Sequence, residues 1–183
     1  MRIVSGKYKS RRFEVPKNFK ARPTTDFAKE NLFNVLSNLI DFEDMEALDL
    51  FSGTGSISYE LISRGCKEVV SIEKDSAHYA FIKKIKEQLK MENLLTIKGD
   101  AFKYLENNGR TFDFIFADPP YALKNLAQVP EIILKNDLLK EDGVFVMEHP
   151  QEYDFSSLPF FSQKREYGSV NFSIFIKENN HGT

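Results

Sequence analysis

The chain lacks several features that would place it in particular classes of protein. Among its 183 residues there is one cysteine, Cys66, and no tryptophan. A single cysteine excludes an internal disulfide framework and a multi-cysteine zinc site. The three histidines are scattered and show no metal-ligand spacing. No apolar run approaches the ~20 residues of a membrane span, and the basic N-terminus is not followed by the apolar stretch of a secretory signal. We therefore expect a cytoplasmic protein with no metal ion and no membrane partner.

The composition is that of a folded protein, but the charge is uneven. Hydrophobic residues make up 42% and charged residues 28% of the chain, and the formal net charge is −2. Residues 1–30 hold nine lysines and arginines against three acidic residues, a net charge of +6, so residues 31–183 carry −8. Such asymmetry indicates either a basic end that binds nucleic acid or a solvated tail.

The basic residues near the N-terminus are interleaved with aromatic ones. The cluster consists of Lys7, Lys9, Arg11 and Arg12. Tyr8 and Phe13 lie beside them, and cations with neighbouring aromatic rings suit RNA or DNA. Residues 2–5 and 11–15 predict two short strands of a hairpin that carries this cluster.

From residue 47 onward, strand-like and helix-like patterns alternate. Strands are expected at 47–51, 68–73, 94–98, 112–117 and 143–148. Helices are expected at 26–39, 56–64, 75–91, 101–107 and 125–139. This alternation predicts a parallel sheet covered on both faces. The segment 160–178 instead predicts two adjacent strands joined near Gly168, an antiparallel hairpin that closes the sheet.

Acidic residues stand at the ends of four predicted strands. They are Asp49, Glu73, Asp100 and Asp118. In an open α/β sheet, ligands bind outside the carboxyl ends of the strands. One buried acid is commonly a structural group, but four at equivalent positions are better explained by a ligand.

The segment DLFSGTGS joins the first of these strands to a helix. Gly53 and Gly55 can adopt positive φ and let a ligand approach the backbone. Ser58 occupies the third glycine position of the dinucleotide fingerprint, so that fingerprint is not met. Glu73 follows at a spacing near the ~20 residues expected for a ribose-binding acid. The sequence therefore predicts a nucleoside ligand without a required pyrophosphate, which fits S-adenosylmethionine, with Asp100 accepting from the adenine amino group.

The segment DPPY, residues 118–121, follows the fourth predicted strand. An exocyclic amine of a nucleobase is a poor nucleophile, and two acceptors aimed at its N–H bonds help it to pyramidalise. The Asp118 carboxylate and the Pro119 carbonyl can do this, and Tyr121 offers a stacking face. Asp118 can also take the released proton. The simpler alternative is a strand ended by an X-Pro-Pro turn with Tyr121 on the surface.

The sequence resembles the bacterial RsmD-type methyltransferases, which modify a guanine N2 in 16S ribosomal RNA. The resemblance covers nearly the whole chain through MRIVSGKYKSRRFEVP, RPTTD, LDLFSGTGSISYELISRG, IEKD, GDA, FDFIFADPPY and a late YG. It implies an α/β fold: a Rossmann-like, seven-stranded class I methyltransferase sheet, mostly parallel with an antiparallel C-terminal hairpin. It also implies a basic N-terminal hairpin extension over 1–21 that grips RNA, followed by the methyltransferase domain over 22–183.

The resemblance also assigns site residues. Those at the target base are Asp118, Pro119, Pro120 and Tyr121. The expected contacts to S-adenosylmethionine are Asp49, Phe51, Gly53, Gly55, Glu73, Lys74, Asp100 and Ala101. The expected RNA contacts are Lys7, Lys9, Arg11, Arg12, Arg22 and Thr24. The family loop is commonly FAGSG where this chain has FSGTG, a change between small residues. The implied partner is 16S RNA in a partly or fully assembled small subunit, and the chain is expected to act as a monomer.

Three alternatives remain at this stage. A DNA adenine-N6 or cytosine-N4 methyltransferase can share DPPY and the cofactor loop, but it usually needs a further recognition region. A dinucleotide-dependent oxidoreductase leaves DPPY unexplained. An RNA-binding module without catalysis leaves the four aligned acids unexplained. Glu148 and His149 stand at the end of the fifth predicted strand, and no role is assigned to them.

Overall fold

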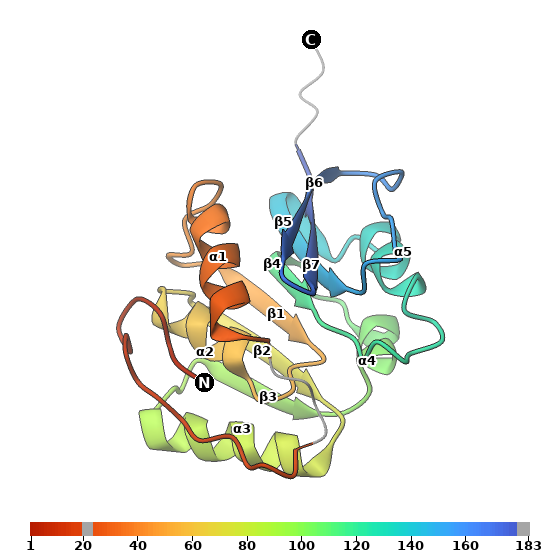
Figure 1. Cartoon of the computed structure of the whole chain (residues 1–183). Coiled ribbons are helices and arrows are strands. Elements are labelled where there is room, and N and C mark those ends of the chain that lie inside the picture. Colours follow the sequence, from red (N-terminus) through yellow and green to blue (C-terminus); the bar gives the residue numbers. More distant parts are fainter. Residues whose placement is uncertain (20–23, 179–183) are drawn as a thin grey trace.

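The computed structural model describes residues 1–19 and 24–178, which build a seven-stranded sheet with helices on both faces (Figure 1). The strands are β1 (Glu46–Leu50), β2 (Glu68–Glu73), β3 (Leu94–Lys98), β4 (Phe112–Ala117), β5 (Leu139–His149), β6 (Phe161–Tyr167) and β7 (Val170–Ile176). Their order is β3-β2-β1-β4-β5-β7-β6. The first five pair in parallel, and β7 is antiparallel to both β5 and β6. The predicted parallel sheet with an antiparallel closing hairpin is confirmed.

The helices divide between the two faces. They are α1 (Asp26–Ser37), α2 (Ser56–Ser63), α3 (Ser76–Leu89), α4 (Ala101–Asn107) and α5 (Gln128–Lys135). Successive strand residues point to opposite faces. In β4, Phe114 and Phe116 belong to the core under α1, α2 and α3, whereas Ile115 and Ala117 belong to the core under α4 and α5. Burial on both faces explains why these strands are apolar at nearly every position.

The order of the strands reverses at β1. From β1 the chain builds outward to β2 and β3 on one side, then returns to place β4 on the other side of β1. β1 and β4 are paired neighbours, with Leu50 opposite Ala117. The segments that leave these two strands therefore start side by side, at the topological switch point where open α/β sheets bind their ligands.

Two predicted boundaries near β5 were wrong. The helix expected at 125–139 is shorter, and the strand expected at 143–148 begins at Leu139. Leu139 pairs with Phe112, and a register shift precedes the next pair, which Val144 makes with β4. Such a bulge interrupts the alternation on which the sequence pattern relies.

The N-terminal segment reverses direction but does not form the strands expected over 2–5 and 11–15. A single antiparallel bridge joins Arg2 and Arg12. The expected boundary between an extension and the main domain, at residues 21 and 22, lies outside the described residues.

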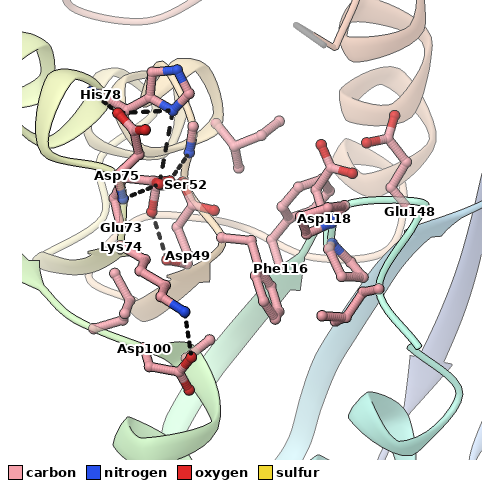
Figure 2. Close-up of a pocket in the computed structure, with 18 of the residues that line it drawn as sticks. Asp49, Ser52, Glu73, Lys74, Asp75, His78, Asp100, Phe116, Asp118 and Glu148 are labelled. Carbon is pink, nitrogen blue, oxygen red and sulfur yellow. Dashed lines mark hydrogen bonds and ion pairs between the residues drawn. The ribbon is translucent and has the colours of Figure 1, made fainter. Parts of the chain in front are cut away.

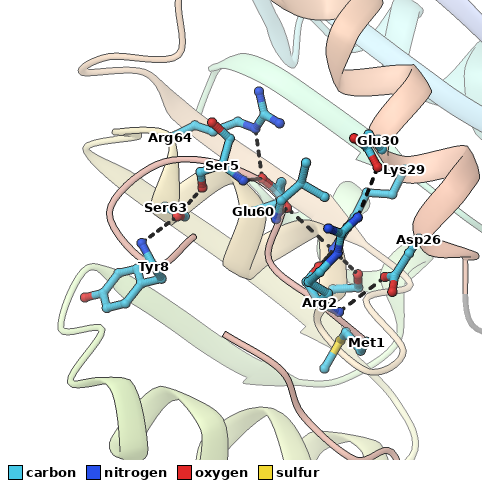
Figure 3. A network of polar contacts seen from close by, with 12 residues as sticks. Met1, Arg2, Ser5, Tyr8, Asp26, Lys29, Glu30, Glu60, Ser63 and Arg64 are labelled. Carbon is cyan, nitrogen blue, oxygen red and sulfur yellow. Dashed lines mark hydrogen bonds and ion pairs between the residues drawn. The ribbon is translucent and has the colours of Figure 1, made fainter. Parts of the chain in front are cut away.

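The two arms share a few backbone hydrogen bonds: the N–H of Ile3 donates to the carbonyl of Arg11 at 2.9 Å, and that of Phe13 to the carbonyl of Met1 at 3.0 Å. Residues of α2 take up other backbone donors of this segment, which a regular ladder would need. The N–H groups of Val4 and Ser5 donate to the two carboxylate oxygens of Glu60, at 2.8 and 3.1 Å (Figure 3). The N–H of Tyr8 donates to Ser63 Oγ at 2.9 Å. The first residues are therefore fastened to α2 at several points.

Among the described helices, none is long and apolar enough to cross a membrane.

Candidate active site

A cavity of about 880 Å³ lies at the carboxyl ends of the central strands (Figure 2). Of the residues singled out in the sequence, those that line it are Thr24, Asp49, Phe51, Gly53, Glu73, Lys74, Asp100, Ala101, Asp118, Pro119, Pro120 and Tyr121. The strand-end rule therefore brings together residues from four separate strand–loop junctions. Their individual roles remain predictions.

The turn after β1 is a left-handed backbone segment held by its own hydrogen bonds. Phe51, Gly53 and Gly55 have φ values of 57°, 58° and 83°. Ser52 Oγ donates to the carbonyl of Asp49 at 2.8 Å, and the N–H of Gly55 donates to the carbonyl of Ser52 at 2.8 Å. The turn therefore presents a fixed backbone surface to the cavity.

Gly55 serves packing in this turn. A Cβ at Gly55 would lie 2.5 Å from the ring carbon Cζ of Tyr59, and the left-handed φ disfavours a side chain as well. Tyr59 is fully buried and its hydroxyl donates to the carbonyl of Thr54 at 2.7 Å. Gly55 is not among the described residues that line the cavity, so its expected contact with the cofactor stays a prediction.

Glu73 connects the end of β2 to this turn. One carboxylate oxygen accepts from the N–H of Gly53 at 2.6 Å and the other from the N–H of Asp75 at 3.0 Å. These bonds fix the orientation of the carboxylate. Because an ionised carboxylate offers about four lone-pair sites, Glu73 keeps the capacity to accept from hydroxyl groups of a ligand.

Asp100 has a structural task of its own. Its Oδ1 accepts from the N–H of Lys103 at 3.1 Å and caps α4, while Oδ2 lies 3.6 Å from Nζ of Lys74. The side chain of Lys74 is 80% exposed, so this ion pair is weak. Capping leaves Oδ2 at the cavity wall, where the sequence predicts a contact with adenine.

Asp49 is the most deeply buried acid of the site, with 1% of its surface exposed. Burial raises its pKa to about 7; the hydrogen bond from Ser58 opposes this and the charge of Glu73 adds to it. Ser58 Oγ donates to Asp49 Oδ2 at 2.6 Å. Ser58, which broke the dinucleotide fingerprint, is therefore the partner of this acid.

Asp118 follows β4 and faces a second acid that the sequence left without a role. Glu148, on β5, is 4% exposed and lines the same cavity. Burial and the hydrogen-bonded carboxyl group of Glu148 raise the pKa of Asp118 well above its ordinary value. Thr24 Oγ1 lies 3.5 Å from Asp118 Oδ2 and is its donor. Asp118 therefore holds its proton to a higher pH than an ordinary aspartate. Glu148 also stands at the end of a strand, as the four selected acids do. This position was the signal in the sequence that could have identified it.

The prolines of DPPY shape the rim of the cavity. Pro119 is buried and Pro120 is exposed. The carbonyl of Pro120 accepts from the N–H of Leu123 at 2.9 Å, which closes a turn around Tyr121. Tyr121 is half-buried at the cavity wall, as a ring available for stacking requires.

The charge of the cavity is strongly negative. The carboxyl groups that line it are those of Asp49, Glu73, Asp75, Asp100, Asp118 and Glu148. Among the described lining residues, Lys74 is the only lysine or arginine. Such a site favours ligands that bring positive charge or hydrogen-bond donors. No group of three or more His, Cys, Asp or Glu side chains within residues 1–19 and 24–178 could hold a metal ion.

Of the predicted RNA contacts, Thr24 lines the cavity, whereas the four basic residues lie on the N-terminal segment and are not among its lining residues. Lys7, Lys9, Arg11 and Arg12 are exposed, and none forms an ion pair with a described residue. A second cavity, of about 870 Å³, lies between residues 13–17 and the start of α1 and shares Thr24, Thr54 and Ser56 with the first. A hollow surface therefore runs from residues 13–17, which follow the basic cluster, towards Asp118. Arg22 lies outside the described residues.

Comparison with known proteins agrees with this geometry. A family model described as Conserved hypothetical protein 95 matches residues 1–176. Ribosomal RNA small subunit methyltransferase D of Buchnera aphidicola is 29% identical over 184 residues, covering 98% of this chain and 93% of that protein. The protein of the same name from Escherichia coli K12 is 29% identical over 181 residues, covering 97% and 90%. The solved structure of yhhF from Escherichia coli superposes with a TM-score of 0.85 at 27% identity, covering 97% of this chain and 98% of that one.

The matched region includes the basic segment, the glycine turn after β1 and the DPPY segment after β4. The chain belongs to the RsmD-type family of methyltransferases.

Proposed function

We propose that this enzyme transfers a methyl group from S-adenosylmethionine to the exocyclic N2 amino group of a guanine in 16S RNA of the small ribosomal subunit. The observation that carries the proposal is the position of Asp118 and its two prolines beside the glycine turn of β1, in one acid-lined cavity. The names of the relatives, which are ribosomal RNA small subunit methyltransferases, support the choice of RNA.

The cavity suits S-adenosylmethionine in size and charge. Its volume of about 880 Å³ is within the range of small-molecule sites. Glu73 would accept from the ribose hydroxyls and Asp100 from the adenine amino group. The backbone around Gly53 would hold the methionine end, near Asp49. A sulfonium and an ammonium group bring the positive charge that this cavity favours.

S-adenosylmethionine supplies, when bound, an electrophilic methyl group on a positively charged sulfur. The residues of this chain orient the amine and manage its proton. Asp118 and the carbonyl of Pro119 accept from the two N–H bonds, which directs the nitrogen lone pair away from them. The nitrogen loses one proton as it becomes methylated, and Asp118 is placed to accept it. Tyr121 stacks on the base, which must be unpaired or extruded to reach the cavity.

The proposal is tested by supplying radiolabelled S-adenosylmethionine with one of three acceptors: assembled small subunits, naked 16S RNA or duplex DNA. We expect label in N2-methylguanosine from the ribosomal acceptors and none in DNA. Digestion to nucleosides and chromatography identify the product. Label in N6-methyladenine or N4-methylcytosine of DNA would contradict the proposal, and transfer to none of the three would favour an RNA-binding module.

Neutralising the basic segment should weaken RNA binding and flatten its salt dependence. Replacing Lys7, Lys9, Arg11 and Arg12 together with glutamine removes four exposed charges. Each lost phosphate contact lowers the slope of log K against log salt by about 0.7–0.9. We therefore expect a slope smaller by up to about 3, measured by filter binding over a salt series.

A matched pair of variants separates a specific surface from net charge. Lys7→Gln with Lys9→Gln is compared with Lys103→Gln with Lys135→Gln. The second pair is also exposed but lies on α4 and at the end of α5, which cover the other face of the sheet. Equal changes of slope in the two pairs would mean that the N-terminal cluster is a solvated tail that contributes only net charge.

A further inference from the structure

We propose that Glu148 selects guanine: together with Asp118 it forms a pair of acceptors that reads the two adjacent donors, N1–H and N2–H, on the edge of the target base. The inference rests on the proposed function for the reaction and adds the residue that distinguishes guanine from the other amino-bearing bases.

The sheet places the two carboxyl groups side by side. β4 and β5 are parallel neighbours with Ala117 opposite Met147, so Asp118 and Glu148 occupy the next positions on adjacent strands. Adjacent strands lie about 4.8 Å apart. Ala117 and Met147 point into the core under α4 and α5, and the next residues therefore point to the opposite face, towards Thr24 and the cavity. Figure 2 shows Asp118 and Glu148 together, across the cavity from Glu73.

A purely structural role explains Glu148 poorly. A buried acid is normally paired with a cation or with several donors. Glu148 is 4% exposed, yet it forms no ion pair with a described residue, and its hydrogen-bonded neighbour is another acid, Asp118. The neighbouring Glu148 helps to raise the pKa of Asp118, and acids perturbed in this way are concentrated at functional sites. The pair is better explained by a ligand that supplies donors.

Guanine has the matching pattern of donors. Its Watson–Crick edge carries N1–H next to the N2 amino group, and flipped bases are commonly read along this edge. Adenine and cytosine have an amino group as well, but the neighbouring ring nitrogen, N1 or N3, is an acceptor. A carboxyl group has acceptor lone pairs on both oxygens, so Asp118 and Glu148 can each accept from the base while they lie side by side. Glu148 would therefore meet N1–H of guanine, whereas it would face a lone pair on adenine or cytosine.

The size of the expected discrimination follows from the unmade hydrogen bond. A buried polar group left without its partner costs about 1–3 kcal/mol, which corresponds to roughly 5–150-fold in rate or affinity. Asp118 alone cannot supply this preference, because the amino group that it contacts is common to all three bases.

The experiment uses small subunits reconstituted with 16S RNA that carries either guanine or 2-aminopurine at the methylated position. 2-Aminopurine keeps the amino group at C2, but its ring N1 is an acceptor. We expect wild-type enzyme to methylate guanine at least roughly 5-fold faster than 2-aminopurine in single turnover. In Glu148→Gln the side-chain amide can donate to N1 of 2-aminopurine, so the guanine preference should fall by at least roughly 5-fold. 2-Aminopurine also lacks the oxygen at C6. The effect of this loss on the rate is common to both enzymes and cancels when their ratios are compared.

Two further variants and a second readout keep the test decisive. Glu152→Gln changes an exposed glutamate just beyond β5 and should leave the ratio unchanged. Glu148→Asp keeps an acceptor and should keep the preference for guanine. If Glu148→Gln is too slow on both bases, equilibrium affinities of the two RNAs give the same ratio. An unchanged ratio in Glu148→Gln by rate and by affinity overturns the inference while N2-methylguanosine formation by wild-type enzyme still stands. Absence of that product with wild-type enzyme refutes the proposed function itself.

Discussion

Replacing Asp118 with alanine will lower the single-turnover rate of methyl transfer by roughly 10²–10⁴-fold, the range that a positioned proton acceptor contributes. The affinity for S-adenosylmethionine should remain nearly intact, because the acids expected to hold it, Glu73 and Asp100, lie across the cavity (Figure 2). Rapid-quench assays measure the rate, and isothermal titration calorimetry measures cofactor binding. Loss of cofactor binding in this variant would instead place Asp118 in the cofactor site.

The matched control is Asp113, an aspartate within β4, the strand that Asp118 follows. It lies near the start of the strand, where it accepts from the N–H of Glu46 at 2.9 Å and contacts Lys140 at 3.4 Å. Asp113→Ala should lower stability and leave the transfer rate of the folded enzyme unchanged. Equal losses of rate in the two variants would mean that Asp118 acts through the strand and not on the base.

The environment of Asp118 also predicts how the transfer rate of the wild-type enzyme changes with pH. Burial and Glu148 raise the pKa of Asp118, with Asp49 adding to the shift and Thr24 opposing it. The ionised form of Asp118, which accepts the proton, therefore becomes more abundant as pH rises. The rate of methyl transfer should rise with it. Asp118→Asn should remove this rise from the residual rate.

The sheet and its ligand-binding edge could be predicted because they depend on local patterns. Apolar runs such as 112–117 need no distant partner to be recognised as buried strands. Once the strands are parallel, the residues that follow them must gather at one edge, which is how Asp49 and Asp118 could be placed together. The glycine turn was equally local, since positive φ favours glycine.

The features that could not be predicted depend on contacts between segments far apart in sequence. The N-terminal strands were expected from their pattern, but the side chain of Glu60 takes the donors of Val4 and Ser5. Glu148 stands at a strand end like the other acids, but its importance becomes visible only when Asp118 is found beside it. Lys29 gave no signal at all, because a lysine on a helix is expected in solvent.

Lys29 is the buried centre of the contact between the N-terminus, α1 and α2, and replacing it with methionine should destabilise the protein by about 3–5 kcal/mol. Its side chain is fully buried, and Nζ donates to the carbonyl of Arg2 at 2.5 Å and to Ser56 Oγ at 3.0 Å. Nζ also lies 3.5 Å from the carboxylate of Glu60, which is fully buried too (Figure 3). Burial lowers the pKa of Lys29, and the charge of Glu60 opposes this shift. Each of the two buried groups therefore stabilises the charge of the other.

Methionine fills a similar volume but removes the charge that Glu60 faces. Arg64 Nε, at 2.9 Å, then remains as the ionic partner of Glu60, and the acceptors at Arg2 and Ser56 lose their donor. Urea denaturation followed by circular dichroism measures the loss. Glu30→Gln is the control, because Glu30 pairs with Arg2 at the surface, where an ion pair contributes about 1 kcal/mol or less.

A double-mutant cycle distinguishes the ion pair from the packing of the lysine stem. If Lys29 and Glu60 stabilise one another, Lys29→Met combined with Glu60→Gln will be less destabilising than the sum of the two single changes, by more than about 1 kcal/mol, since neither buried charge of the pair then remains without the other. Additive losses would contradict the pairing and assign the effect of Lys29→Met to the bonds with Arg2 and Ser56. Because Ser56 lines both cavities, loss of its hydrogen bond to Lys29 should also disturb the wall of the active site. Folded Lys29→Met should therefore bind RNA less tightly than Glu30→Gln under the same conditions.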